Sequence, residues 1–320
     1  MRMHSINAYS LEQIRELVSQ LGQPAFRAKQ LIQWLYAKDS VSYGDMTNLP
    51  ASLREQLSRE FPLDIPTIIE KRISKDGSRK YLLEFADGSQ VETVGIPSTD
   101  SNAQGQPRRL TVCFSTQVGC AMACAFCATG TEGFTRNLLP GEIVQQVLTV
   151  QRDFGMRVSN VVAMGQGEPF LNYQNLLSAL RILNSADACA IGARHITVST
   201  CGIPEGIAAF SNEPEQFTLA LSLHSAVQVT RDILMPRCKA YPLTPLNSAL
   251  HSYYQTAGRR VSLEYLMIDN MNTDAEHLNA LQAFCDGLQL HVNLLPLNSV
   301  EGSPFQPCDK ANLTAWTTAL

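Results

Sequence analysis

The first part of the chain carries apolar residues at helical spacing. Ser10 is placed to cap a helix over LEQIRELVSQLG, and a further helix is expected over ASLREQLSREF. Between them, PAFRAKQLIQWLYAK is predicted to bring four apolar residues to roughly one helical face, namely Phe26, Leu31, Ile32 and Leu35. The pattern therefore predicts a small helical domain at the N-terminus.

The pattern changes to alternation at Lys71. The segment RISKDGSRKYLLEFADGSQVETVGIP contains two alternating runs separated by Asp-Gly pairs, which predicts a β-hairpin or short meander. The polar stretch STDSNAQGQPRR, residues 98–109, is expected to be a loop or linker.

After residue 110, short β-rich runs alternate with longer amphipathic stretches. Six strands are expected over LTVCFST, NVVAMG, HITVST, FTLALSLH, RVSLEYLMI and LHVNLLPL, with five helical stretches between them and a sixth from near Asp309. This order predicts an α/β fold with a parallel sheet and helical crossovers. Periodicity alone does not decide between a doubly wound sheet and a barrel.

Composition is typical of a packed globular protein. The 320 residues are 45% apolar and 17% charged, and no run approaches the roughly 18 apolar residues that a membrane helix requires. We expect three regions: an accessory helical domain at 1–68, a β-hairpin and linker at 69–109, and the α/β core at 110–320. We also expect a cytoplasmic monomer that binds no membrane.

Net charge and cysteine content argue against two classes of protein, nonspecific nucleic-acid binders and disulfide-bonded secreted proteins. A net charge of −4 argues against nonspecific coating of nucleic acid, although residues 1–80 carry 12 Lys and Arg against 9 Asp and Glu. Nine cysteines, an odd number, in a chain without a signal peptide favour reduced thiols or metal ligands over disulfides.

The most specific local signal is the run Cys120-Ala-Met-Ala-Cys124-Ala-Phe-Cys127, which follows the first strand of the core. Three thiols at this spacing let one loop surround one metal centre. A structural zinc site needs four ligands, and Cys113 and His195 lack the spacing to complete one. An iron–sulfur cluster with three cysteines keeps one iron open for a substrate. The alternative is that these are buried, inert cysteines.

Polar residues follow several of the predicted strands. In a β/α barrel the active site is built at the C-terminal ends of the strands. The second strand ends in Gly165-Gln166-Gly167-Glu168-Pro169, where glycines permit close backbone approach and Glu168 is suited to an ammonium group. The other strand ends carry Ser199-Thr200, Ser222-Leu223-His224 and Asn298. Each alone is more typical of an ordinary loop residue.

These motifs resemble those of a known family. CxxxCxxC with Phe126 before the last cysteine is similar to the radical S-adenosylmethionine superfamily, and GQGEP resembles its GGEP motif, with Gln166 as a departure. FRAKQLIQWLY, VETVGIP, VCFSTQVGCAMACAFCATGTEGFTRNL, ITVSTCGIP, ALSLHS, LMPR and VNLLPLN resemble, more closely still, the RlmN family of bacterial adenine-C2 methyltransferases. The resemblance implies a partial (β/α)6 barrel with a small N-terminal helical domain and a connecting β-hairpin.

The resemblance also implies cofactors. Cys120, Cys124 and Cys127 would hold a [4Fe–4S] cluster whose open iron binds S-adenosyl-L-methionine. One electron, from a flavodoxin- or ferredoxin-type donor, would cleave that molecule to a 5′-deoxyadenosyl radical. The residues implied to position it are Gly167, Glu168, Ser199, Ser222, Leu223, His224 and Asn298.

Two further residues acquire catalytic roles from the resemblance. In this family a methylated cysteine near the C-terminus donates the methyl group to C2 of adenine, in 23S ribosomal RNA and in transfer RNA at the adenine 3′ of the anticodon. Cys113 matches the second cysteine, which releases the product as a disulfide forms, and Glu92 matches the proposed base. Cys308 lacks the motif of the methyl-carrying cysteine. The chain stops at ANLTAWTTAL, short of that motif. We expect a longer natural chain, and the alternative is a natural variant that lacks the methyl-carrying cysteine.

Other functions stay open at this point. The leading interpretation uses the helical domain and six basic residues to hold RNA: Arg27, Lys29, Lys71, Arg72, Arg79 and Lys80. These residues are equally compatible with a solvated surface. The alternatives are the related Cfr-type C8 methyltransferase, a noncatalytic iron–sulfur RNA-binding protein, and a structural zinc protein with another activity.

Overall fold

The computed structural model describes residues 5–102, 104–298 and 302–320. The chain divides into two compact units. The first unit contains residues 1–118, 136–166 and 172–196, and the second contains residues 119–135, 167–171 and 197–320. Each unit is thus assembled from segments that lie far apart in the sequence.

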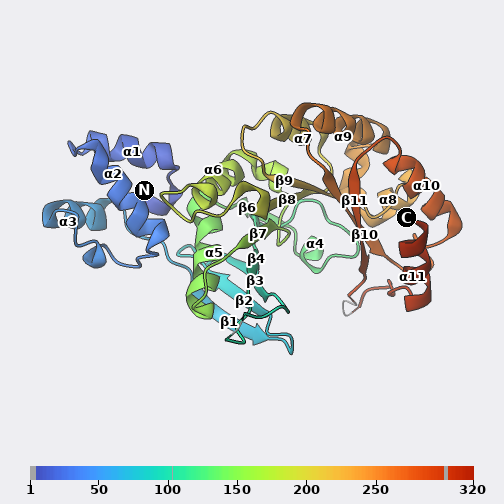
Figure 1. The fold of residues 1–320 in the computed structure, drawn as a ribbon, viewed down its shortest axis with the longest axis horizontal. Coiled ribbons are helices and arrows are strands. Elements are labelled where there is room, and N and C mark those ends of the chain that lie inside the picture. Colours follow the sequence, from blue (N-terminus) through green and yellow to red (C-terminus); the bar gives the residue numbers. More distant parts are fainter. Residues whose placement is uncertain (1–4, 103, 299–301) are drawn as a thin grey trace. The chain divides into compact units, whose positions relative to one another are not determined.

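Three helices, drawn in blue in Figure 1, begin the first unit. They are α1 (Leu11–Gln20), α2 (Ala25–Ile32) and α3 (Ala51–Glu60), and α2 continues as a π-helical turn, η2 (Gln33–Ala37). Ser10 caps α1 through a reciprocal bond pair with Gln13, as the sequence predicts. Short 3₁₀ turns lie at η1 (Ile6–Ala8) and η3 (Tyr43–Asp45).

The prediction that Phe26 lies on roughly the same helical face as Leu31, Ile32 and Leu35 is wrong. Leu31, Ile32 and Leu35 are buried, but Phe26 is 56% exposed, with the Arg27 guanidinium 4.8 Å from its ring centroid. Phe26 and Leu35 are nine positions apart, and at about 100° per residue this places them on opposite sides of the helix.

The strands of the first unit follow the order β1-β2-β3-β4-β7. Strands β1 (Thr67–Ile73), β2 (Arg79–Glu84) and β3 (Gln90–Pro97) form an antiparallel meander, the second of the two forms that the sequence predicts, and β3 pairs antiparallel with β4 (Leu110–Cys113). Strand β7 (Asn160–Ala163) then pairs parallel to β4. The change of direction marks where the meander joins the α/β core.

Two helices complete this unit, α5 (Pro140–Phe154) and α6 (Tyr173–Asn184). Helix α5 packs closely on β3 at Gly95, where a Cβ would lie 2.6 Å from both Val150 and Phe154. Tyr81, Thr93 and Val112 lie on the same face of the strands as Gly95, and all three are buried. This is therefore the face that α5 covers. The opposite face carries half-buried and polar residues.

The second unit contains four parallel strands in the order β8-β9-β10-β11. They are β8 (Ile196–Thr200), β9 (Thr218–Ser222), β10 (Val261–Met267) and β11 (Leu290–Pro296). The helices are α7 (Pro204–Ser211), α8 (Gln228–Leu234), α9 (Leu243–Ala257), α10 (Ala275–Cys285) and α11 (Lys310–Ala319). All six strands expected after residue 110 are therefore confirmed, and Asp309 caps the last helix.

Short elements that the sequence pattern did not predict flank the cysteine run. Strand β5 (Gln117–Gly119) precedes it, and α4 (Ala128–Glu132) and β6 (Phe134–Asn137) follow. The remaining 3₁₀ turns are η4 (Pro169–Asn172), η5 (Ala193–His195) and η6 (Pro236–Ala240). Within the described ranges, no helix is both long and apolar enough to cross a bilayer.

Candidate functional site

The three cysteines of the motif lie on one tightly folded loop between β5 and α4. Cys120 donates its N–H to the Gly133 carbonyl at 2.8 Å, and Cys127 donates to the Cys124 carbonyl at 3.1 Å. All three side chains are half-buried and none forms a disulfide. The loop therefore folds back on itself and gathers its thiols within one short segment.

Two glycines permit this loop. Gly119 has φ of +72°, and a Cβ there would lie 1.9 Å from the Gly133 carbonyl oxygen. At Gly130, a Cβ would lie 2.7 Å from the Cys124 carbonyl oxygen. Any larger residue at either position would displace the backbone that carries the cysteines.

The electrostatics of the loop suit a cationic centre. Burial raises the pKa of Cys120 and of Cys124 above the usual value, and the neighbouring thiols and Glu168 raise both further. Thiolates here thus need a positive charge such as a metal centre to be stable. In the described residues, no three His, Cys, Asp or Glu side chains are placed to hold one metal ion. Cysteines on a four-iron cluster bind different irons, so this spacing fits a cluster better than one zinc ion.

Glu168 is buried at the loop that follows β7. Its carboxylate accepts hydrogen bonds from the Phe170 N–H at 3.0 Å, the Thr200 hydroxyl at 2.7 Å and the Cys201 N–H at 2.7 Å. Burial raises the pKa of Glu168 despite these bonds. Within the second unit, Glu168 therefore joins the segment 167–171 to the end of β8, and Gly167 precedes it at φ of +99°.

The ends of β8 and β9 lie together. Ser199 and Ser222 have their hydroxyl oxygens 3.2 Å apart. The next residues after Ser222, Leu223 and His224, donate their N–H groups to the Glu264 carbonyl on β10 at 3.0 and 3.3 Å. The structure thus brings together two strand ends that were predicted separately, at Ser199 and at Ser222.

His224 is a neutral residue beside the cysteine loop. Its Nδ1 accepts the Leu266 N–H at 3.1 Å, which places the ring proton on Nε2. Burial lowers the pKa of His224 to about 3. The ring lies edge to face against Phe126, with centroids 4.9 Å apart. Since Phe126 directly precedes Cys127, this contact places His224 next to the cysteines.

Asn298 is the remaining residue of the predicted cofactor set. It is exposed, after the end of β11, and the chain directly beyond it lies outside the described residues. Every other member of the set, from Cys120 to His224, belongs to the second unit, as Asn298 does.

Glu92 and Cys113 belong to the first unit. Val94 on β3 lies directly opposite Cys113 on β4, and Glu92 is two residues from Val94. Glu92 and Cys113 therefore share one sheet face, as diagonal neighbours. Burial raises the pKa of the Cys113 thiol to about 11. The Glu92 carboxylate forms an ion pair of 2.6 Å with Lys80.

The backbone of Glu92 is fixed by Ser115, to which the sequence did not point, and by Gln166 of the GQGEP turn. The Ser115 hydroxyl donates to the Glu92 carbonyl at 2.6 Å and accepts the Gln166 N–H at 2.9 Å. The Gln166 side chain accepts the Glu92 N–H at 3.4 Å. Gln166, the departure from the family motif, thus contributes a bond to the strand that carries Glu92.

Ser115 is held in turn by Gln146 of α5. The Gln146 amide accepts from the Ser115 N–H at 2.8 Å and from the Thr93 hydroxyl at 2.6 Å, and donates to the Ser115 carbonyl at 3.0 Å. All three residues are buried. Gln146 therefore connects α5 to both β3 and the end of β4.

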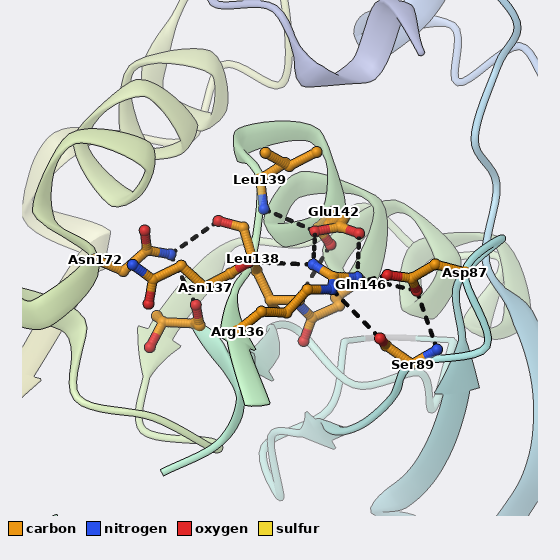
Figure 2. A network of polar contacts seen from close by, with 10 residues as sticks. Asp87, Ser89, Arg136, Asn137, Leu138, Leu139, Glu142, Gln146 and Asn172 are labelled. Atoms are coloured by element: carbon orange, nitrogen blue, oxygen red, sulfur yellow. Dashed lines mark hydrogen bonds and ion pairs between the residues drawn. The ribbon is translucent and has the colours of Figure 1, made fainter. Parts of the chain in front are cut away.

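The network continues to Arg136, shown in Figure 2. Arg136 forms a two-pronged contact with Glu142 at 2.7 and 2.8 Å and an ion pair of 2.9 Å with Asp87. Gln146 also donates to the Glu142 carbonyl at 3.2 Å. This chain of polar contacts, buried at Gln146 and Glu142 and partly exposed at Arg136 and Asp87, links the β2–β3 turn to α5. Its only sequence signal is the presence of Glu142 and Gln146 in an otherwise amphipathic helix.

The six basic residues expected to bind RNA all contact protein partners. Lys71 and Arg79 bind Asp153 of α5 at 2.8 and 2.7 Å, and Lys29 binds Asp187 at 3.0 Å. The remaining contacts are Arg72 to Glu70, Lys80 to Glu92, and Arg27 to Gln30 and the Asn48 carbonyl. Arg72 and Lys80 differ from Lys71 and Arg79 because they occupy the face opposite α5.

Two family models match the chain. Residues 6–62 match the N-terminal domain of ribosomal RNA large subunit methyltransferases, and residues 114–274 match the radical SAM superfamily. The second match includes Cys120, Cys124, Cys127 and Glu168.

Similar proteins cover almost the whole chain. A Synechococcus protein, named a probable dual-specificity RNA methyltransferase RlmN, is 44% identical over 97% of this chain and 87% of its own length. A Gloeobacter violaceus protein of the same name is 45% identical over 97% of the chain and 86% of its own length. The crystal structure of a radical SAM methyltransferase from Sphaerobacter thermophilus superposes with a TM-score of 0.92 at 37% identity, covering 99% of this chain and 92% of that one.

Proposed function

Because the chain belongs to the RlmN family of radical S-adenosylmethionine enzymes, we propose that it methylates C2 of adenine in 23S ribosomal RNA and in transfer RNA. The transfer RNA target is the adenine 3′ of the anticodon. The observation that carries this proposal is the cysteine loop, whose Phe126 packs on His224 within the unit that contains Glu168, Ser199 and Ser222.

Cys120, Cys124 and Cys127 would hold a [4Fe–4S] cluster. When bound, the cluster supplies the electron that cleaves S-adenosylmethionine and an open iron for that molecule. Gly167 and Glu168 form the turn that would lie against S-adenosylmethionine. Ser199, Ser222 and Asn298 would offer it hydrogen-bonding groups, and Leu223 and His224 would present their backbone to it beside Ser222.

Glu92 and Cys113 would handle protons and thiol chemistry on one sheet face. A thiol with a pKa of about 11 is almost fully protonated at neutral pH, so Cys113 must lose its proton to attack sulfur. Glu92, its diagonal neighbour across β3 and β4, is suited to accept a proton during turnover. Ser115 and Gln166 fix the main chain at Glu92.

RNA contact is best supported for Arg72 and Lys80. The register places Arg72, Lys80, Val94 and Cys113 in one continuous row across β1, β2, β3 and β4. Both cations are exposed and lie on the face of Glu92 and Cys113. Lys71 and Arg79 lie on the other face and hold α5 through Asp153. Phosphates approaching the catalytic residues would therefore meet Arg72 and Lys80.

We also propose a cytoplasmic enzyme that receives electrons from a flavodoxin- or ferredoxin-type protein. All nine cysteines are free, which suits a reducing compartment. RNA and small electron carriers are both available there.

The proposal is tested by reconstituting the cluster anaerobically in the natural full-length protein. The protein is then supplied with S-adenosylmethionine, reductant and unmodified ribosomal or transfer RNA, and the nucleosides are analysed by mass spectrometry. We expect 2-methyladenosine. Formation of 8-methyladenosine would instead identify a Cfr-type enzyme. RNA binding without cleavage of S-adenosylmethionine would identify a noncatalytic RNA-binding protein.

A further inference from the structure

A row of polar side chains crosses the strands of the second unit. Ser222 on β9 lies opposite Glu264 on β10, and Glu264 lies opposite Asn293 on β11. Ser199 extends the row to β8 through its hydroxyl contact with Ser222. Direct cross-strand partners share a face, so these four polar side chains lie on the same side of the sheet.

The row lies on the face of the strands opposite α9 and α11. On β10, Leu263 and Tyr265 alternate with Glu264 and are fully buried, and the Tyr265 ring packs against Trp316 of α11 at 5.3 Å. On β9, Leu221 packs toward α9, because Leu246 and Leu221 both crowd Gly202. Glu264 therefore points away from α9 and α11, to the side of Ser199 and Ser222.

Glu264 is a buried carboxylate with few hydrogen-bond donors to replace the water it loses. Its side chain accepts one hydrogen bond, from the Asn293 amide to Oε1 at 2.9 Å. It is 8% exposed. Among the residues that the structure describes, no Lys or Arg forms an ion pair with it. Burial of a carboxylate is costly unless donors replace the lost water, so this position is suited to a ligand that brings donors.

The backbone of Glu264 connects it to the expected cofactor residues. Its carbonyl accepts the N–H groups of Leu223 and His224. Its neighbours in the row, Ser199 and Ser222, are uncharged hydroxyls that donate and accept hydrogen bonds. Such a set matches a vicinal diol, whereas a sulfonium has no hydrogen-bond donor to offer Glu264.

We propose that Glu264 binds the ribose hydroxyls of S-adenosylmethionine, with Asn293 holding its carboxylate in place. This inference rests on the proposed function and adds a cofactor-binding residue to it. The signal was present in RVSLEYLMI, where Glu264 is the one charged residue between apolar neighbours of a core strand.

The test measures binding rather than methylation. The Kd values for S-adenosylmethionine and for S-adenosylhomocysteine, which lacks the positive sulfur, are measured on cluster-loaded protein carrying Glu264→Gln. Loss of a charged acceptor from a buried hydrogen bond is expected to raise both Kd values by roughly 10- to 100-fold. The iron content and thermal unfolding temperature should match those of the wild type, and Glu276→Gln, an exposed acid on α10, should leave both Kd values unchanged.

The same Kd measurement is then made with a 2′-deoxyribose analogue of S-adenosylhomocysteine, so that removal of the Glu264 charge and removal of a ribose hydroxyl can be compared alone and together. We expect Glu264→Gln to weaken this analogue clearly less than the parent nucleoside, because the hydroxyl partner is already missing. Equal losses for both, a loss confined to S-adenosylmethionine, or no loss at all would overturn the assignment. If Glu264→Gln unfolds, Glu264→Asp, which keeps the charge but shortens its reach, is measured in the same way. Wild-type protein that binds both nucleosides but forms no methyladenosine would refute the proposed function alone.

Discussion

Cys113 and Glu92 lie on the same face of the β3–β4 pair, as diagonal neighbours set by the pairing of Val94 with Cys113. The 98–109 segment lies between their strands in the sequence, so this proximity depends on antiparallel register rather than on local spacing. It places Glu92 on the same sheet face as a thiol whose pKa is raised to about 11 by burial. The two residues can therefore act in one proton-dependent step.

Replacement of Ser115 by Ala should remove the hydrogen bonds that hold the Glu92 backbone in place. The Glu92 carbonyl and the Gln166 N–H each lose a buried partner, at a cost of about 1–3 kcal/mol in the free energy of unfolding. We expect a lower rate of methyl transfer with S-adenosylmethionine affinity retained. Denaturant unfolding and single-turnover kinetics measure the two effects, and Ser178→Ala, on the exposed side of α6, is the control. Unchanged kinetics and stability would show that the Ser115 contacts are dispensable.

Gly130→Ala should damage the cysteine loop. The added Cβ would lie 2.7 Å from the Cys124 carbonyl oxygen, so the backbone between Cys124 and Cys127 must move. We expect at most half of the wild-type iron and sulfide after anaerobic reconstitution, measured chemically. Gly192→Ala is the matched control, since its Cβ would meet only the His195 ring at 3.2 Å. Full iron loading of Gly130→Ala would contradict this account of the loop.

Substitutions on one face of the meander should affect RNA binding, and a substitution on the opposite face should affect stability. We expect Arg72→Ala and Lys80→Ala to weaken RNA binding severalfold, to reduce its salt dependence and to leave the unfolding temperature nearly unchanged. Arg79→Ala should instead lower the unfolding temperature, because it removes contacts to Asp153 and to the Phe154 ring. Filter binding at several salt concentrations, together with thermal unfolding, distinguishes the two groups. Equal effects on RNA affinity from both faces would refute the assignment.

Asp153 should contribute stability that acid removes. Burial raises the pKa of Asp153, but its bonds to Lys71, Arg79 and Tyr81 outweigh this and lower it from 3.8 to about 2. A carboxyl with a depressed folded-state pKa stabilises the fold fully above its unfolded pKa, and this contribution is lost as the pH falls from about 4 to 2. Asp153→Asn should therefore be less stable than wild type at pH 7, with the difference shrinking toward pH 2. Urea unfolding across this range measures it, with exposed Glu55→Gln as the control. A pH-independent difference would exclude the charge as its cause.

The sequence was sufficient for elements whose signals are local. Apolar runs such as LTVCFST and NVVAMG identified the core strands, and Ser10 and Asp309 identified helix starts through their caps. The spacing of Cys120, Cys124 and Cys127 identified the loop because the motif fits within eight residues. Each of these predictions depends on neighbours in the chain.

The contacts that the sequence did not predict join residues that lie far apart along the chain. The bonds from Ser115 to Glu92 and from Gln146 to Thr93 join segments whose approach is set by sheet register and by the packing of α5. A buried Gln or Ser looks the same in the sequence as an exposed one, so the presence of Glu142 and Gln146 in α5 did not reveal which partners they bind. Glu264 was detectable in principle, because burial of a charged residue in an apolar strand is costly and therefore indicates a binding partner.

The most direct test of the central claim is a spectrum of the cluster in the cysteine loop. Wild-type protein, Cys124→Ala and Cys285→Ala are reconstituted anaerobically with iron and sulfide, and each is examined by Mössbauer spectroscopy with and without S-adenosylmethionine. We predict a four-iron cluster in the wild type and in Cys285→Ala, with one iron changing its signal when S-adenosylmethionine is added, and little or no cluster in Cys124→Ala. A cluster of equal yield in Cys124→Ala, or a wild-type spectrum that S-adenosylmethionine leaves unchanged, would contradict the claim that these three cysteines hold an open-iron cluster.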